Sequence, residues 1–227
     1  MDKITFTIPK STKLLALKPN SNPPIKQPNN LNYVQIAPNV YKFVTDINDN
    51  VHALYHKAVE LRKTNVREAL ALFEKCKTLI NDSVKPEMVY EIFVNLALLV
   101  TELDGSIDIV EHYYEDALNI YPDRAEPYYY LSIYCQKRSN YEKSYELLKK
   151  ALLLSYEEAI NKYSNVQHNA YGKYLYDNLS VACYWLKKYD EAIHLIENII
   201  DDPDFANHKE RLLKNLDLSK IELTNGI

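Results

Sequence analysis

The sequence has very little glycine, and this scarcity limits the kinds of protein it can be. Only three of its 227 residues are glycine. Phosphate-binding loops and tight hairpins need glycine where the backbone takes a positive φ or approaches a ligand closely, whereas helices do not. The scarcity therefore predicts a mainly helical chain, and no phosphate loop or dinucleotide fingerprint is present in the sequence.

Cysteines, clustered basic residues and long apolar runs are also scarce. Cys76, Cys135 and Cys183 are odd in number and widely spaced, which fits neither a disulfide framework nor a zinc site and favours a reducing compartment. The formal net charge is −4, without the clustered Lys and Arg of a nucleic-acid-binding surface. The N-terminus lacks the apolar run of a signal peptide, and no stretch approaches the roughly 20 apolar residues of a membrane helix. We expect a cytoplasmic protein with no membrane span and no nucleic-acid partner.

Proline is concentrated before residue 47, where six of the ten prolines lie. Because proline fixes φ and removes a hydrogen-bond donor, a helix cannot propagate through this segment. Two pieces with alternating polarity, 4–8 and 40–44, could be extended. Residues 1–47 are therefore predicted to be extended or disordered, either lying on the body of the protein or carrying a linear motif for a partner.

After residue 47 the apolar residues recur at intervals of three and four, which predicts paired helices. The expected pairs are 48–63 with 66–81, 86–103 with 106–120, 125–138 with 141–155, and 171–186 with 189–201. The predicted helical domain, 48–227, thus contains units at about 48–81, 86–120, 125–155 and 171–203, followed by a capping helix at 204–217.

The third and fourth units share the same offsets. Ser132 precedes Ser144 by twelve residues, and Ser180 precedes Ala192 by twelve. This pattern resembles the tetratricopeptide repeat (TPR), in which small residues lie where paired helices cross most closely. The resemblance covers about 48–203. It implies an all-α, right-handed solenoid of about four stacked helix pairs.

A narrower resemblance covers about 121–216. The segment Tyr121–Leu131 is similar to the repeat region attached to some family 2 glycosyltransferases of bacteria and large DNA viruses. The further matching pieces are 177–182, 184–185, 189–192, 211–212 and 215–216. In those proteins catalysis belongs to a separate nucleotide-sugar domain, for which this chain has no room. The resemblance implies an accessory protein of a glycosylation pathway, without transferase activity in this chain.

Two local features carry further expectations. Asp123 and Glu126 have the spacing of a capping box at the start of the fifth helix. The residues around 157–169, which make the fourth unit's spacing unusually long, are predicted to extend the helix after Ala151 and to form a longer connection.

The TPR resemblance also predicts a partner-binding groove, made by the inner side of each first helix. The expected groove residues are Tyr55, Val59, Arg62, Val94, Asn95, Leu98, Thr101, Tyr129, Ile133, Gln136, Tyr174, Asp177, Val181 and Tyr184. Rings interleaved with a few polar groups suit a peptide or a glycan, because an aromatic ring offers contact area at a low entropy cost. The N-terminal segment or the final helix could instead cover these rings.

These observations favour a non-catalytic scaffold that binds a protein or peptide. The alternatives are an accessory protein that recognises a glycosyltransferase or its acceptor, and an enzyme that uses the tyrosine-rich groove. His52 and His56 have the spacing of a metal pair, but no third ligand is evident and a solvated face is the simpler interpretation. We expect no catalytic residues, no cofactor and no metal.

Overall fold

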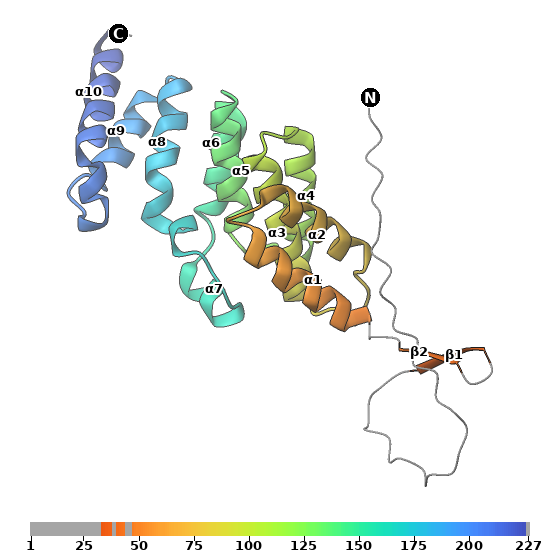
Figure 1. Cartoon of the computed structure of the whole chain (residues 1–227). Coiled ribbons are helices and arrows are strands. Elements are labelled where there is room, and N and C mark those ends of the chain that lie inside the picture. The colour runs from red at the N-terminus through yellow and green to blue at the C-terminus, as the bar shows by residue number, and fades with distance from the viewer. Residues whose placement is uncertain (1–32, 38–39, 44–46, 226–227) are drawn as a thin grey trace, which may run out of the picture. The chain divides into compact units, whose positions relative to one another are not determined.

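The computed structural model describes residues 33–37, 40–43 and 47–225, and side chains from residue 50 onward (Figure 1). The chain divides between Asn50 and Val51 into two units. The predicted extended piece at 4–8 lies outside the described residues.

The first unit contains a short antiparallel pair of strands, β1 (Tyr33–Ala37) and β2 (Val40–Phe43). Tyr33 pairs with Phe43, and the register shifts between Gln35 and Ala37. Of the predicted extended piece 40–44, residues Val40–Phe43 form one of the two strands, and residue 44 lies outside the described residues.

The described residues form ten α-helices, and in the second unit these pack in consecutive pairs (Figure 1). Each pair contacts the next one, so that the helices stack as a solenoid and the predicted all-α fold is confirmed. The pairs are α1 (Ile47–Leu61) with α2 (Val66–Thr78), α3 (Pro86–Glu102) with α4 (Ile107–Ile120), α5 (Glu126–Lys137) with α6 (Tyr141–Ala151), and α8 (Tyr176–Trp185) with α9 (Tyr189–Glu197). Helix α7 (Tyr156–Lys162) lies between the third and fourth pairs, and α10 (Lys209–Asn225) follows the last.

The small residues predicted at the helix crossings are buried. Ser132, Ser144, Ser180 and Ala192 are each at most 2% exposed. Burying a hydroxyl is unfavourable unless it is hydrogen-bonded. Ser132 Oγ donates to the Tyr129 carbonyl at 2.7 Å, and Ser180 Oγ donates to the Asp177 carbonyl at 2.7 Å. Serine can therefore occupy these crossings, because its hydroxyl donates a hydrogen bond to a backbone carbonyl of its own helix.

The helices of the last three pairs are joined by the same left-handed turn. Asp104, Ser139 and Lys187 have φ of 53°, 58° and 60°. In each turn the next residue's N–H bonds back to a carbonyl five residues earlier, as Asn140 does to Cys135 at 2.9 Å. This is the Schellman arrangement, which usually places glycine at the left-handed position. Here the chain uses Asp, Ser and Lys instead.

Residues 152–170, which we call the insertion, differ from the prediction. Helix α6 ends at Ala151 instead of continuing, and α7 begins as a separate helix. Ser155 caps α7 by accepting from the Glu158 N–H at 3.3 Å. Because Ser, Asp and Asn side chains bond the first-turn amides, this cap starts a new helix.

The predicted capping box at Asp123 and Glu126 is wrong. Helix α5 begins at Glu126 without a side-chain cap. Asp123 instead accepts from Lys162 Nζ at 2.6 Å and from the Tyr163 hydroxyl, both in the insertion. The spacing of a capping box is therefore present, but both carboxylates accept hydrogen bonds from residues of the insertion instead of capping the helix.

The final helix also differs in its bounds. Residues Pro203–His208 form a 3-10 helix, and the α-helix runs from Lys209 to Asn225, beyond the predicted end at 217. Asp202 accepts from the Asp204 N–H at 3.0 Å and so caps the 3-10 segment. Leu212, Leu216 and Ser219 bury one side of α10, which explains why the helix continues.

Candidate functional site

The first helices of successive pairs form one side of the solenoid, which we call the inner face. It comprises α1 from residue 51, α3, α5, α8 and finally α10. Helix α3 contacts α5 directly, and α8 contacts α10. All of the groove residues predicted from the sequence lie on these helices or at their ends.

Arg62 and Asn95 link the first and second pairs on the inner face. Arg62 Nη1 donates to Asn95 Oδ1 at 2.8 Å, and Asn95 Nδ2 donates to the Glu91 carbonyl at 2.7 Å. Asn95 and its neighbour Val94 are buried, so their side chains build the floor of the face rather than offer contact area. Arg62 is exposed.

Tyrosines lie around this polar pair. Tyr55 is half-buried, its ring meeting that of Phe73 edge-on at 5.9 Å between centroids. Burial, and next the charge of Glu91, raise the pKa of the Tyr55 hydroxyl to about 12. Burial is also the main cause that raises the pKa of the Glu91 carboxyl, while Arg124 acts in the opposite direction. Glu91 was not among the predicted groove residues.

The predicted residues of α5 are divided between contact surface and packing. Tyr129 and Ile133 are half-buried and form part of the face. Gln136 instead joins two helix pairs, because its Nε2 donates to Ser144 Oγ at 2.9 Å and to the Asn178 carbonyl at 2.8 Å.

The remaining predicted residues of the first two pairs differ in exposure. Val59 is exposed on α1, and Leu98 and Thr101 are half-buried on α3.

Two predicted residues of the fourth pair contact the C-terminal segment. Asp177 forms a bidentate ion pair with Arg211, with distances of 2.9 and 2.6 Å. Tyr174 stacks on Phe205 at 5.8 Å and donates its hydroxyl to Asp204. The final helix and the segment before it therefore occupy part of the inner face, as one of the two sequence-based alternatives supposed.

Val181 and Tyr184, by contrast, line an open cavity between α8 and α10. The cavity has a volume of about 170 Å³. Trp185 stands at its edge with 57% of its surface exposed and stacks on Tyr141, 5.2 Å between ring centroids. The other lining residues are Ser180, Ile196, Asn215, Leu218 and Ser219. This cavity is mainly apolar; its two serines are buried and donate their hydroxyls to helix carbonyls, and Asn215 contributes a half-buried amide.

The sequence reasoning missed a buried ion pair at the start of α5. Arg124 and Glu126 are each 1% exposed, and Arg124 Nη2 lies 2.8 Å from Glu126 Oε1. The guanidinium also donates to the Asn165 carbonyl at 3.1 Å, and Glu126 accepts from the Gln167 N–H at 2.9 Å. The pair thus holds the insertion in place, and the only sequence signal for it was the unusually long spacing before the fourth unit.

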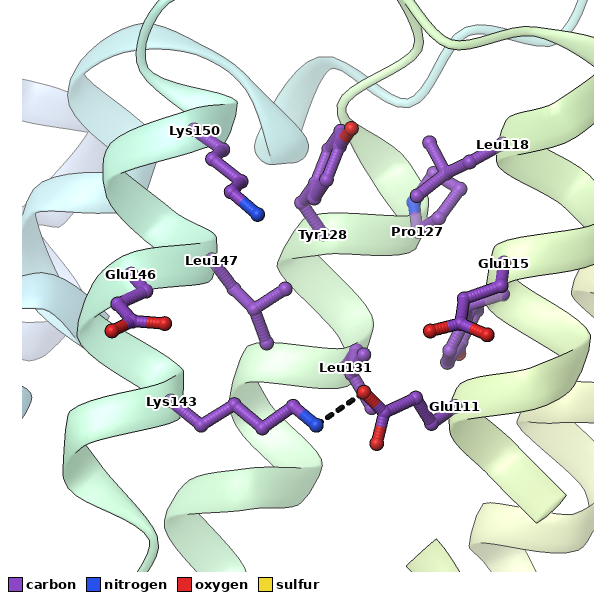
Figure 2. A pocket seen from close by; sticks show the side chains of 11 residues that line it. Glu111, Glu115, Leu118, Pro127, Tyr128, Leu131, Lys143, Glu146, Leu147 and Lys150 are labelled. Carbon is purple, nitrogen blue, oxygen red and sulfur yellow. Dashed lines mark hydrogen bonds and ion pairs between the residues drawn. The ribbon is translucent and has the colours of Figure 1, made fainter. Parts of the chain in front are cut away.

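A second hollow lies on the side formed by the second helices, between α4 and α6 (Figure 2). It has a volume of about 230 Å³ and a floor of apolar and aromatic side chains from the start of α5. Glu111 and Glu115 stand on its α4 wall, and Lys143 and Lys150 on its α6 wall. Lys143 and Glu111 form an ion pair across the hollow.

Within the described residues, no group of three or more His, Cys, Asp or Glu side chains is placed to hold a metal ion. None of the helices in the described ranges combines the length and the apolar character needed to cross a membrane.

Comparisons with known proteins identify the fold alone. No family model matches the sequence, and no curated protein matches it. Three similar solved structures are a putative kinesin light chain from Podosopora anserina with TPR-like repeats, MamA from Desulfovibrio magneticus, and apo RapI. Their TM-scores are 0.57, 0.53 and 0.61, with 13%, 13% and 15% identity. The matches cover 80%, 79% and 77% of this chain and 90%, 94% and 64% of the other chain. The chain therefore has a TPR-like solenoid fold, and no link to a glycosyltransferase is found.

Proposed function

We propose that this protein is a non-catalytic scaffold that binds a segment of a partner protein on its inner face. The observation that carries the proposal is the open, mainly apolar cavity between α8 and α10. A cavity of this kind accepts one apolar side chain, and such anchors supply most of the binding energy of protein interfaces.

The surroundings of the cavity support a peptide ligand. Val181, Tyr184 and Leu218 provide apolar walls, while the half-buried Asn215 provides an amide that can meet a peptide backbone. Several other expected groove residues, including Tyr55, Tyr129 and Ile133, continue the surface along the solenoid. An extended or helical segment lying along these helices would contact several pairs at once.

The proposal is tested by selecting peptides from a displayed random library on the immobilised full chain. Leu218 lines the cavity and is 40% exposed, so that Leu218→Glu places a charge at the cavity without disturbing the core. We expect the selected peptides to share an apolar anchor and to bind this variant at least about ten-fold more weakly, as for loss of a central anchor. Titration calorimetry measures the affinities.

Leu213→Glu is the matched control, because Leu213 is on the same helix, is 43% exposed and does not line the cavity. We expect it to bind the peptides as the unmodified chain does. Failure to select any peptide, or equal affinity for the unmodified chain and both variants, would contradict the proposal.

A second candidate is the accessory role in glycosylation, which rests on the sequence resemblance of 121–216. The exposed face of Trp185, held by stacking on Tyr141, favours it because sugar rings pack on such faces. However, Asp177 and Arg211, which belong to two segments of that resemblance, pair with each other and so have a packing role. A glycan array probed with the unmodified chain and with Trp185→Ala tests this candidate. Binding that Trp185→Ala loses would support it, and absence of binding would remove it.

A further inference from the structure

The hollow between α4 and α6 has no part in the proposed function. Its volume of about 230 Å³ lies below the roughly 300–1,000 Å³ that is usual for pockets that bind small molecules and cofactors. An apolar cavity of about 150 Å³, however, already holds a benzene ring. The size of the hollow therefore suits a single apolar side chain of a partner protein.

The floor of the hollow is made of apolar and aromatic side chains. Pro127, Leu131 and Leu147 are buried in it, and Leu118 and Tyr128 are half-buried. An apolar side chain that entered from a partner would remove more of this surface from water, which is the main favourable contribution to protein association. The floor thus selects for an apolar group.

The two walls of the hollow have opposite charge. Helix α4 contains four acidic side chains and no Lys or Arg, whereas three of the five charged side chains of α6 are lysines. Glu115 extends from the α4 wall and Lys150 from the α6 wall toward the centre of the hollow (Figure 2). Glu146 also lines the hollow, but its carboxylate lies over α6 itself. The α4 wall is therefore negative and the α6 wall positive.

The charged residues of the walls differ in whether they already have a partner. Glu111 and Lys143 form an ion pair that crosses the hollow at one end (Figure 2). Glu115 follows Glu111 by four residues on α4, and Lys150 follows Lys143 by seven on α6. Both are exposed, and in the part of the chain that the structure describes neither side chain has a hydrogen bond or an ion pair. A partner can therefore pair with both without breaking an existing interaction.

This arrangement of charge restricts the kind of partner. A ligand with charges of one sign, such as a nucleic acid, would be attracted by one wall and repelled by the other. A ligand with a basic group on the α4 side and an acidic group on the α6 side would be attracted by both. The hollow is thus complementary to an apolar group that has opposite charges on its two sides.

We propose that the hollow binds a segment of a protein partner in which one apolar side chain lies between a basic and an acidic residue. The apolar side chain occupies the floor, the basic residue pairs with Glu115 and the acidic residue pairs with Lys150. The hollow is on the side formed by the second helices, so this site is separate from the inner face and its cavity between α8 and α10. The chain would therefore hold two partner segments at once.

The test selects peptides on the full chain carrying Leu218→Glu, which places a charge at the inner-face cavity. The displayed library has an apolar residue at its centre and random residues on both sides. We expect the selected peptides to have a basic residue on one side of the central residue and an acidic residue on the other. Replacing the central residue by alanine should weaken binding at least about ten-fold in titration calorimetry, as for loss of an anchor.

Charge reversal then assigns each end of the peptide to a wall. Glu115→Lys, added to Leu218→Glu, should weaken binding about five- to ten-fold at low salt, because it replaces the attraction of an exposed ion pair by repulsion. A peptide whose basic residue is changed to glutamate should recover most of this loss. Lys150→Glu should act in the same way on the acidic residue. Recovery by paired reversal shows that the two groups interact directly.

Asp108→Lys is the matched control, because Asp108 is also an exposed carboxylate of α4 but does not line the hollow. It changes the net charge as Glu115→Lys does and should leave the affinity within about two-fold, since only a screened long-range effect remains. The substituted side chains are exposed, so each variant should keep the thermal melt of the unmodified chain within a few degrees.

Three results would overturn the inference. These are failure to select any peptide on Leu218→Glu, selected peptides that respond to neither Glu115→Lys nor Lys150→Glu, and a loss that the reversed peptides do not recover. A loss on Asp108→Lys equal to that on Glu115→Lys would also overturn it, because net charge alone would then explain the effect. The proposed function is judged separately, by peptides selected on the unmodified chain and their response to Leu218→Glu.

Discussion

The three cysteines show how a residue's position in the repeat decides its chemistry. Cys76, Cys135 and Cys183 are free thiols and fully buried. Burial is the largest cause that raises their pKa values, to about 11 for Cys76 and Cys135 and about 12 for Cys183. Since the thiolate is the reactive form, these groups are poor nucleophiles as well as inaccessible.

We therefore expect none of these thiols to react with a disulfide reagent in the native protein at mildly alkaline pH. All three should react in guanidinium chloride, where the chain is unfolded and the thiols have ordinary pKa values. Absorbance of the released thiol measures the reaction. Ala71→Cys, at an exposed position of α2, is the positive control, and native labelling without that substitution would contradict the assignment.

At the scale of elements, the turns within the helix pairs are the informative feature. The scarcity of glycine correctly indicated helices, yet three turns still adopt the left-handed conformation, at Asp104, Ser139 and Lys187. A non-glycine residue there is strained by its Cβ, by roughly 1–2 kcal/mol. The packing of the two helices joined by each turn must outweigh this strain.

Ser139→Gly should consequently raise the free energy of unfolding, by up to about 1 kcal/mol after the extra entropy of glycine in the unfolded chain is subtracted. Urea unfolding followed by circular dichroism measures the change. Ser139→Ala keeps the Cβ and should give no such gain. If alanine and glycine stabilise equally, the turn is not strained.

The insertion is the second informative element, because the Arg124–Glu126 pair ties it to the start of α5. Removing one member of a buried pair leaves the other charge without compensation. We expect Arg124→Met to lower the free energy of unfolding by about 3–5 kcal/mol. Adding Glu126→Gln removes the remaining charge and should recover part of this loss. Urea unfolding tests both variants, and equal losses would show that the charge is not the cause.

At the scale of the whole molecule, stability comes from stacking of neighbours. The buried side chains form separate clusters, and one of them joins α9, the segment after it and α10 through Ile196, Ile199, Phe205, Leu212 and Leu216. In such stacks each unit depends mainly on adjacent units. The last helix therefore protects the end of the solenoid without directly supporting the second pair.

Leu212→Ala removes a fully buried side chain from this terminal cluster and should destabilise it by roughly 2–5 kcal/mol. Hydrogen exchange should show loss of protection in α9 and α10 while α3 and α4 remain protected. A uniform loss along the chain would show instead that the solenoid unfolds as one cooperative unit.

Sequence alone determined the helical pairs and their close crossings, because the period of apolar residues and the paired small residues are local properties. Ser132, Ser144, Ser180 and Ala192 could be assigned in this way. The residues predicted for a groove lie on the first helices or at their ends, and their binding of a partner stays a prediction.

Only the tertiary structure decided which of those residues a partner could reach. Val94 and Asn95 are buried against neighbouring helices, and Asp177 is paired with Arg211 of a helix 34 residues away. The position of the insertion could not be predicted from the sequence either, because the hydrogen bonds that hold it join residues about 40 positions apart. The helical period depends on residues that are close in the sequence. Exposure and ion pairing instead depend on which distant segments meet in the folded chain.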